Sequence, residues 1–258
     1  MPELPEVEHA ARTLEAAVRG KRVEQLRVRH PALERRLPAE RARRVRGRVV
    51  RRVERRGKHQ LLHLDDGSVI HVHFRMTGDW AIGRVGEDDV PFARAVLEFE
   101  DGTRVSLVDP RALATLALHD SDGALPELGP EPFDAAFTAE SLGVALARRR
   151  GPIKPALLDQ RVVAGLGNIY VAEALWLARI SPRASAATLS AERRRRLVQA
   201  IRRVLRRAPA GRYWADERTA RWRVYDREGE PCPRCRATIA RIVQAGRSTY
   251  FCPRCQRS

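Results

Sequence analysis

The sequence predicts an α+β protein of several domains, and three observations lead to that fold class. Apolar residues alternate as in β-strands over 45–118, and beyond residue 134 they recur with helical spacing. All four cysteines lie in the last 27 residues. Because 258 residues are many for one domain, we expect a β-rich half, a helical half and a small cysteine module.

A helix is expected directly after the N-terminus. The opening MPELPEVEHAARTL places Pro5 at the first helical position, where a missing N–H is tolerated, and Gly20 ends the helix. The helix does not explain Pro2. Once Met1 is removed, Pro2 would carry a secondary amine as the free end of the chain.

Two short motifs mark hairpin turns in the β-rich half. Asp66-Gly67 and Asp101-Gly102 each separate two apolar runs. Within one strand, His71 and His73 alternate with apolar residues, and we expect them to form its polar face. Spaced i, i+2, they could bind a metal, but the sequence shows no third ligand.

Helical spacing follows a linker rich in proline and acids, ELGPEPFD at 127–134. Thr138 is expected to cap a helix that stops at Gly151-Pro152, and Ser190 to cap a second one. Arg193 to Arg196 begin that second helix. A run of charges on a helix is expected to be a solvated face.

The stretch Gly165-Leu166-Gly167-Asn168 lies between the predicted helices. A dinucleotide-binding loop does not fit, because Tyr170 occupies the third glycine position and no strand precedes it. A tight turn into a helix whose N-terminus and Asn168 face a phosphate fits better. A plain helix–helix turn would explain the glycines, but it explains Asn168 less directly.

The charge of the chain indicates a polyanionic partner. Lys and Arg number 49 against 32 Asp and Glu, which gives a net charge of +17. The basic residues are nearly all arginine, whose planar fork donates two hydrogen bonds to a phosphate. A GC-rich genome would exchange Lys for Arg without by itself creating the excess of bases. Nucleic acid is therefore the favoured partner.

No stretch approaches the ~18 consecutive apolar residues of a membrane helix. Glutamates interrupt the N-terminus where a signal peptide would be apolar. We therefore expect no membrane partner and a cytoplasmic protein.

The four cysteines form two CxxC pairs, Cys232 with Cys235 and Cys252 with Cys255, sixteen residues apart. This spacing is typical of a four-thiolate zinc site. Two disulfides are the alternative, and a reducing compartment argues against them. Four protein ligands leave no position for water. We expect one structural Zn²⁺ and no catalytic metal or organic cofactor.

Seven sequence blocks in order carry a family resemblance. They are PELPEVE (2–8), RRGKHQLLHL (55–64), HFRMTG (73–78), DPR (109–111), LGPEP (128–132), LLDQRVVAGLGNIYVAEAL (157–175) and RVYDREGEPCPRC…GRSTYFCPRCQ (223–256). Together they resemble the formamidopyrimidine-DNA glycosylase and endonuclease VIII family of base-excision repair enzymes. The opening heptapeptide is closer to the formamidopyrimidine branch.

The resemblance implies three domains. An N-terminal β-sandwich with an N-terminal helix would span 1–130 and carry catalysis. A helix–two-turn–helix DNA-binding domain would span 131–224, and a four-cysteine zinc-finger hairpin 225–258.

The resemblance also implies a catalytic group at the N-terminus. Pro2 would be the nucleophile, Glu3 the acid/base and Glu6 a supporting carboxylate. A neutral amine can attack C1′ of the damaged nucleotide, and a secondary amine yields an iminium that is cationic without needing a proton. That cation accepts electrons, so the strand can break by elimination of the 3′ and 5′ phosphates.

DNA contacts are implied at five further positions that match the family pattern. Lys58, Asn168 and Arg247 would hold phosphates. Because an enzyme acting on a stacked base must flip it out, other residues must fill the gap. Met76 would be inserted there and Arg111 would face the orphaned base.

The chain departs from the family pattern at several positions. Leu113 would be the wedge where formamidopyrimidine members often have an aromatic residue. His9 and His59 stand where threonine and tyrosine are common. The segment 206–224 is shorter than the loop that caps a flipped 8-oxoguanine, which leaves specificity for that lesion open.

We therefore expect a monomeric, bifunctional DNA glycosylase and abasic-site lyase that acts on damaged double-stranded DNA by β,δ-elimination. Its substrate could be an oxidised purine, an oxidised pyrimidine or mainly an abasic site. A lesion-binding protein that has lost base excision is one alternative, which intact Pro2 and Glu3 disfavour. A zinc-ribbon transcription or ribosomal factor is another, and it leaves the N-terminus unexplained.

Overall fold

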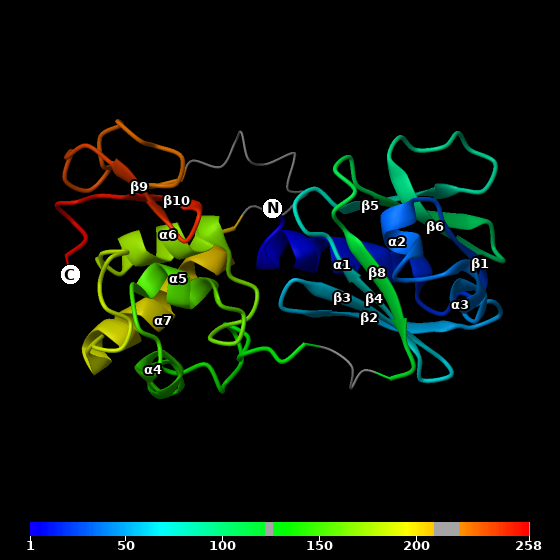
Figure 1. Cartoon of the computed structure of the whole chain (residues 1–258), viewed down its shortest axis with the longest axis horizontal. Coiled ribbons are helices and arrows are strands. Elements are labelled where there is room, and N and C mark those ends of the chain that lie inside the picture. The colour runs from blue at the N-terminus through cyan, green and yellow to red at the C-terminus, as the bar shows by residue number, and fades with distance from the viewer. Residues whose placement is uncertain (122–125, 209–221, 258) are drawn as a thin grey trace. The chain divides into compact units, whose positions relative to one another are not determined.

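The computed structural model describes residues 1–121, 126–208 and 222–257, which form two compact units (Figure 1). Unit 1 holds the described residues of Met1–Pro126, and unit 2 holds those from Glu127 onward. The elements of unit 1 are α1 (Leu4–Val18), β1 (Val23–Val28), α2 (Pro31–Glu34), α3 (Ala39–Arg43), β2 (Val50–Arg56), β3 (His59–Leu64), β4 (Val69–His73), β5 (Asp79–Arg84), β6 (Ala93–Phe99), β7 (Thr103–Val108) and β8 (Thr115–His119). Those of unit 2 are α4 (Ala139–Ala147), α5 (Ile153–Leu158), α6 (Asn168–Leu177), α7 (Ala191–Arg206), β9 (Ala240–Gln244) and β10 (Arg247–Phe251).

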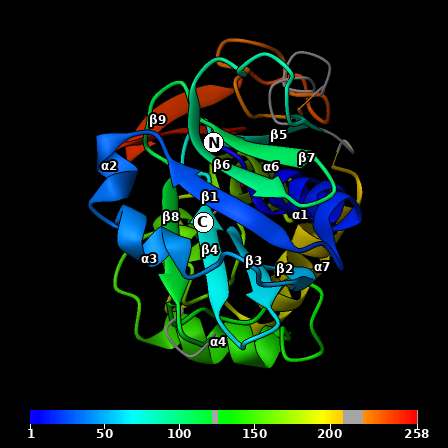
Figure 2. The same ribbon diagram turned by 90° about the vertical axis from the view of Figure 1, so that its right-hand side faces the viewer.

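Unit 1 is a β-sandwich, as the family resemblance implies. One four-stranded sheet has the order β1-β6-β7-β5 and the other β2-β3-β4-β8, with antiparallel neighbours throughout. Figures 1 and 2 show the two sheets as separate layers. Alternate residues of both sheets enter one apolar core, because side chains alternate across a strand. The core includes Val23, Leu26, Leu62, Ile70, Val72, Leu97, Leu107 and Leu116.

Helix α1 adds its apolar face to this core. Leu14 and Val18 are fully buried in it, and Gly20 follows the helix with φ +78°. The helix begins at Leu4, so Pro5 occupies the second helical position and the predicted first position is wrong. The difference is small in energy, since none of the first four N–H groups of a helix has an intrahelical partner.

Both predicted hairpin turns are confirmed. Asp66-Gly67 joins β3 to β4, and Asp101-Gly102 joins β6 to β7. In each turn the aspartate Oδ1 accepts a backbone N–H two residues later, from Ser68 at 3.0 Å and from Thr103 at 2.9 Å. The glycines have φ of +85° and +81°, a conformation that favours glycine.

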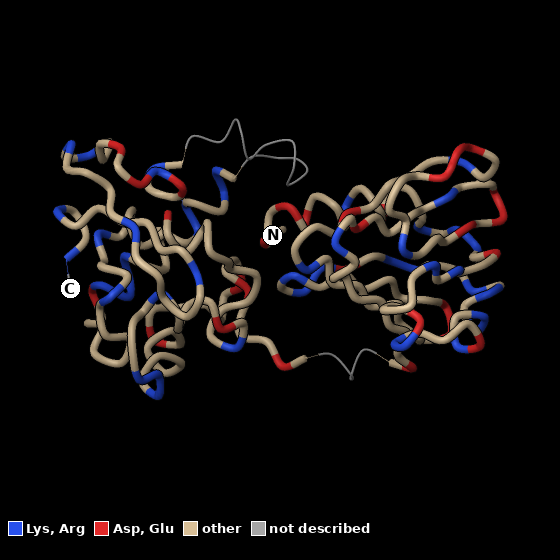
Figure 3. The backbone as a smooth tube through the Cα atoms, turned by 45° about the horizontal axis from the view of Figure 1, so that its top comes forward, with Lys and Arg blue, Asp and Glu red and all other residues tan. Residues whose placement is uncertain are grey.

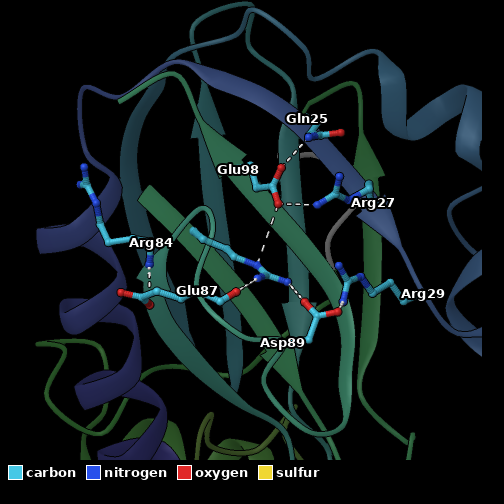
Figure 4. Close-up of polar contacts among 8 residues, drawn as sticks. Gln25, Arg27, Arg29, Arg84, Glu87, Asp89 and Glu98 are labelled. Atoms are coloured by element: carbon cyan, nitrogen blue, oxygen red, sulfur yellow. Dashed lines mark hydrogen bonds and ion pairs between the residues drawn. The ribbon is translucent and has the colours of Figure 1, made fainter. Parts of the chain in front are cut away.

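The outer face of the first sheet carries an ion-pair network (Figure 4). Glu98 of β6 is buried there and accepts a hydrogen bond from Arg27 of β1. Arg104 of β7 is also buried and donates to Asp89, which pairs with Arg29 at 2.7 Å. Since a buried charge is costly without partners, the alternating signs make the burial of Glu98 and Arg104 tolerable.

Two helices of unit 2, α4 and α7, begin at the predicted caps. Thr138 Oγ1 accepts the Ser141 N–H at 3.1 Å, and Ser190 Oγ accepts the Arg193 N–H at 3.3 Å. The first of these helices, α4, ends at Ala147, before the predicted stop. None of the described helices is long and apolar enough to cross a membrane.

The arginine run at the start of α7 is not simply a solvated face, and that prediction is wrong for two of its residues. Arg193 and Arg194 are half-buried. Arg194 Nη1 donates to the Leu189 carbonyl at 2.7 Å, and Arg193 Nη2 donates to the Arg257 carbonyl at 2.9 Å. Long arginine stems can cover apolar surface while their heads bind carbonyl groups, which a count of charges does not reveal.

Candidate functional site

The N-terminal residues lie at the start of α1. Pro2 is buried, and Glu3 is 2% exposed and occupies the N-cap position. Glu6 Oε2 accepts the Glu3 N–H at 2.8 Å, while the Glu3 side chain accepts the Glu6 N–H. This capping box fixes the Glu3 carboxyl beside Pro2 at the positive end of a helix dipole, which favours a negative charge there.

Lys58 lies in the β2–β3 hairpin and is 6% exposed. The preceding Gly57 has φ +59°, which turns the chain tightly enough to bring Lys58 inward. Arg55 in the same hairpin donates to Glu8 of α1 at 2.6 Å, so the hairpin is tied to the helix that follows Pro2. Burial opposes ionisation of Glu8, but Arg55 and Arg12 outweigh it and hold its pKa below the usual value.

Two loops of unit 1 present Met76, Arg111 and Leu113. Met76 is 38% exposed and Leu113 is 43% exposed, so both side chains are accessible to a ligand. The two loops are joined through the buried Asp109, which accepts a hydrogen bond from Thr77 Oγ1. The structure therefore brings the three predicted gap-filling residues to one pair of connected loops.

Asp109 also shapes its own loop. Its Oδ2 accepts the N–H groups of Leu113 and Ala114, both at 2.6 Å, and its Oδ1 accepts that of Arg111 at 3.2 Å. Such a carboxylate holds the turn that displays Leu113. Sequence reasoning missed this role, although the DPR block containing Asp109 was noted. An aspartate before proline is a known turn signal.

At Gly78, the last residue of the MTG segment, the backbone lies close to the backbone of Phe74. A Cβ atom at this position would lie 2.7 Å from the Phe74 carbonyl oxygen and 2.8 Å from its Cα. No flexible side chain could move away to relieve that clash. Only glycine lets the loop that carries Met76 fold back on Phe74.

The outer face of the second sheet carries a row of histidines. His59 Nδ1 lies 2.7 Å from His71 Nε2, and His71 Nδ1 lies 3.2 Å from His119 Nε2. His73 stacks edge-on against His59, with ring centroids 4.8 Å apart. The polar face predicted for His71 and His73 is thus found, together with two histidines that the sequence did not connect to them.

These histidines do not converge on a point. His71 uses one ring nitrogen toward each neighbour, so the contacts run along a line across β3, β4 and β8. Within 1–121, 126–208 and 222–257, the four cysteines are the group whose ligand atoms lie close enough to hold a metal. The histidine row therefore gives no support for a metal between His71 and His73.

Unit 2 holds the two-turn connection between α5 and α6. Gln160 organises it, since its Oε1 accepts the Gly165 N–H at 2.9 Å and its Nε2 donates to the Leu166 carbonyl at 2.9 Å. The backbone carbonyl of Gln160 accepts the Gly129 N–H at 2.8 Å. The turn ends in Asn168, the first residue of α6, as the predicted turn into a helix requires.

Asn168 and Arg247 belong to segments that touch. Asn168 Nδ2 donates to the carbonyl of Ser248, the residue after Arg247, at 3.1 Å. The fully buried Lys154 donates to the same carbonyl at 2.9 Å and to Thr249 Oγ1 at 2.6 Å. The helical turn and the β9–β10 hairpin are thus locked together, and the exposed Arg247 is held beside α6.

Lys154 is a second residue that sequence reasoning missed. A lysine inside the apolar run IKPALL could have indicated a buried ammonium group. Such a group requires acceptors, and the hairpin provides them.

The four cysteines fit a zinc ion. Cys232 Sγ and Cys255 Sγ lie 3.9 Å apart, and Cys235 Sγ and Cys252 Sγ lie 3.5 Å apart. Tetrahedral ligands at the usual ~2.3 Å zinc–sulfur distance would be separated by about 3.8 Å. None of the four cysteines forms a disulfide, so the disulfide alternative is not found. The cluster is the structural zinc site, and Trp176 Nε1 donates to Cys232 Sγ at 3.4 Å.

Family models match the chain in three consecutive parts. The formamidopyrimidine-DNA glycosylase N-terminal domain matches residues 1–116, its H2TH domain matches 128–213, and the zinc finger found in FPG and IleRS matches 229–257. The chain belongs to the formamidopyrimidine-DNA glycosylase family. It is accordingly a DNA-binding glycosylase of base-excision repair, and the resemblance inferred from the seven blocks is confirmed.

Individual members of the formamidopyrimidine-DNA glycosylase family are similar to this chain over its full length. The formamidopyrimidine-DNA glycosylase of Rhodospirillum rubrum is 42% identical over 281 residues, covering 100% of both chains. The Lactococcus lactis enzyme bound to DNA with an abasic site superposes with a TM-score of 0.91 at 31% identity, covering 99% of this chain and 100% of that one. A structure of MutM with DNA containing carbocyclic 8-oxo-G gives a TM-score of 0.89 at 32% identity, covering 100% of both.

The expectation that the segment 206–224 is shorter than the loop that caps a flipped 8-oxoguanine stays a prediction. Most of the 206–224 segment lies outside the described residues. Its last residues are described, and Glu173 of α6 accepts the N–H groups of Arg223 and Val224 at 2.9 and 2.8 Å. The end of the segment is thus anchored on α6.

Proposed function

We propose that this glycosylase is bifunctional, with an abasic-site lyase activity that depends on the amine of Pro2. The observation that carries the proposal is the position of Pro2 directly before a buried Glu3 held at the N-terminus of α1. Pro2 lies before the first residue of α1, so helix formation does not explain a proline there. A nucleophilic secondary amine with an adjacent carboxyl group does explain it.

The chemistry follows from these two groups. After removal of Met1, the neutral Pro2 amine attacks C1′ and displaces the damaged base, which leaves with a proton, while the attacking nitrogen loses its own proton. The C1′–O4′ bond then breaks, O4′ takes up a proton, and the opened sugar is joined to Pro2 as an iminium. An unperturbed α-amino group has a pKa near ~8, which leaves a useful neutral fraction at pH 7. Loss of a C2′ proton expels the 3′ phosphate, and a second elimination expels the 5′ phosphate. Glu3 would carry protons to and from the sugar, with Glu6 supporting its position.

The proposed DNA contacts divide between the units. In unit 1, Lys58 would hold a phosphate, while the loops joined by Asp109 would fill the gap left by the flipped nucleotide through Met76, Arg111 and Leu113. In unit 2, Asn168 and Arg247 would hold phosphates, and their linked segments support a shared role. The substrate would be an oxidised base in double-stranded DNA.

Three coarser features of the organisation are also proposals. The domain limits 1–130, 131–224 and 225–258 are supported by family models that match within similar ranges. A monomer is proposed, to be tested by light scattering. A cytoplasmic location with the nucleoid is proposed, because repair requires access to the chromosome.

Borohydride trapping tests the lyase proposal on three labelled duplexes, with an abasic site, 8-oxoguanine opposite cytosine, and an oxidised pyrimidine. Borohydride reduces an iminium to a permanent link, so we expect a crosslinked band that is lost in Pro2→Gly. The strongest band identifies the preferred lesion. No crosslink to any duplex, with a free N-terminal proline verified and DNA binding intact, would overturn the proposal and favour a lesion-binding protein.

A further inference from the structure

A cavity of about 460 Å³ beside the zinc cluster of unit 2 is lined by arginine. Its lining consists of Arg179, Arg193, Arg196, Arg234, Arg254 and Arg257, with Cys235 and Cys255. They come from the end of α6, the start of α7, both CxxC turns and the C-terminal segment. Figure 3 shows Lys and Arg positions distributed along the backbone of both units. No acidic side chain is among the described residues of this lining.

The zinc cluster alone does not account for so many cations. A Zn²⁺ ion with four thiolates carries two negative charges, which two arginines would balance. Arg196 is paired with Glu192 at 2.6 Å, and Arg193 is engaged by neighbouring groups. The other four arginines, Arg179, Arg234, Arg254 and Arg257, still outnumber the two negative charges, so the described lining holds an excess of positive charge. Cations that face each other without an anion repel, and that repulsion is relieved when an anion binds.

Part of the lining is held in place before any ligand arrives. The Arg234 guanidinium lies over the Trp176 ring, 4.1 Å from its centroid, and donates to the Trp176 carbonyl at 3.1 Å. Arg193 Nη2 donates to the Arg257 carbonyl at 2.9 Å, and the Ser181 N–H donates to the same carbonyl at 3.0 Å. The segments around the cavity are thus fixed to one another, which lowers the entropy cost of binding.

Arg179 stands where a helix usually ends in glycine. It follows the C-cap of α6 with φ +59°, a left-handed conformation that is strained for a residue with a side chain. A glycine would adopt this backbone without strain. The chain places a cation there instead, and that cation lines the cavity.

We propose that this arginine cavity is a binding site for a compact oligophosphate group, such as a diphosphate or triphosphate. Arginine donates paired hydrogen bonds to phosphate oxygens, and several forks around one cavity can surround two adjacent phosphates. The cavity volume is within the range of ~300–1,000 Å³ typical of small-ligand sites. The site lies outside the residues assigned to base excision, and its test does not depend on that reaction.

The test is calorimetric titration of the zinc-loaded full chain with inorganic pyrophosphate at physiological salt, with zinc content measured before and after. The pocket variant Arg179→Gly/Arg254→Gln removes two lining cations and leaves the anchored Arg234 and Arg193 in place. The control variant Arg150→Gln/Arg195→Gln removes two exposed arginines of unit 2 that do not line the cavity. Both variants lower the net charge equally.

We expect saturable binding of one pyrophosphate, weakened about tenfold or more in the pocket variant and less than about threefold in the control. Equal weakening in both variants would assign the binding to the general field of a basic protein and overturn the site. Absence of saturable binding at millimolar pyrophosphate would overturn it as well.

An undamaged DNA duplex separates this site from the DNA interface. We expect the pocket and control variants to bind the duplex equally. Weaker duplex binding by the pocket variant than by the control would assign these arginines to the DNA backbone and overturn the oligophosphate site.

Discussion

At the scale of single residues, buried carboxylates decide how the loops of unit 1 are displayed. Asp109 is fully buried and accepts hydrogen bonds from Thr77, Arg111, Leu113 and Ala114. Both carboxylate oxygens accept hydrogen bonds from backbone N–H groups or a hydroxyl group. A group that donates hydrogen bonds therefore could not replace either oxygen. The identity of this residue is therefore as constrained as that of a catalytic group.

We predict that Asp109→Asn destabilises unit 1 by about 2 kcal/mol, because the amide NH₂ would face backbone N–H groups and leave them unpaired. The variant should also bind an abasic duplex several-fold more weakly, while binding of undamaged duplex changes less. Thermal unfolding and fluorescence anisotropy measure the two effects. Asp88→Asn, on an exposed aspartate, is the matched control and should change neither. An unchanged lesion affinity in the Asp109 variant would show that these loops do not contact the lesion.

At the scale of secondary-structure elements, the second sheet carries a histidine row with a clear pH signature. Burial, followed by the nearby positive charge of Arg75, lowers the pKa of His59 to about 4. Burial and neighbouring histidines lower the pKa of His71 to about 4, and burial with His59 lowers that of His73 to about 3.

These shifts predict acid destabilisation in a defined range. The folded pKa values lie below the unfolded value of 6.5, so the neutral imidazoles stabilise the fold above pH 6.5. That stability is lost as the pH falls from 6.5 toward 4, because the unfolded chain then binds more protons. Urea unfolding gives the free energy of unfolding at pH 7.5 and at pH 5. The decrease in this free energy between the two pH values should be about 1 kcal/mol smaller in His71→Val than in the parent chain, after allowance for solvent screening. Equal pH differences in the two proteins would contradict the lowered pKa of His71.

The elements also show what the sequence could predict. Caps at Thr138 and Ser190 and the two Asp-Gly turns depend on neighbours within a few residues, and they are found as predicted. The links that hold the candidate sites join distant residues. Lys154 to Thr249 is separated by 95 positions, and such a contact has no local sequence signal. His59 and His119 are distant in sequence too, and the sheet register alone brings them to His71.

At the scale of the whole molecule, each unit has its own core. In unit 1 both sheets and α1 share it, and in unit 2 Trp176 and Val224 pack with the buried zinc-site cysteines Cys232 and Cys252. A metal that orders such a short hairpin contributes its binding free energy to folding. Loss of zinc should therefore destabilise unit 2 and leave the stability of unit 1 unchanged.

Calorimetric unfolding of the full chain should show two transitions, one for each unit. Chelation of zinc should lower the midpoint of the unit 2 transition by roughly 20 °C and leave the unit 1 transition in place. It should also weaken duplex binding, because Arg247 lies on the hairpin that the zinc site supports. A single transition that shifts as a whole would show instead that the two units unfold cooperatively.

The most direct test of the central claim is peptide mapping of the borohydride-trapped complex. The protein is crosslinked to an abasic duplex, digested, and analysed by mass spectrometry. We predict that the DNA adduct lies on the N-terminal peptide beginning at Pro2, with Met1 absent, and that Glu3→Gln reduces the yield without moving the adduct. An adduct on a lysine, or an equal yield from chains that retain Met1, would contradict the assignment of Pro2 as the nucleophile.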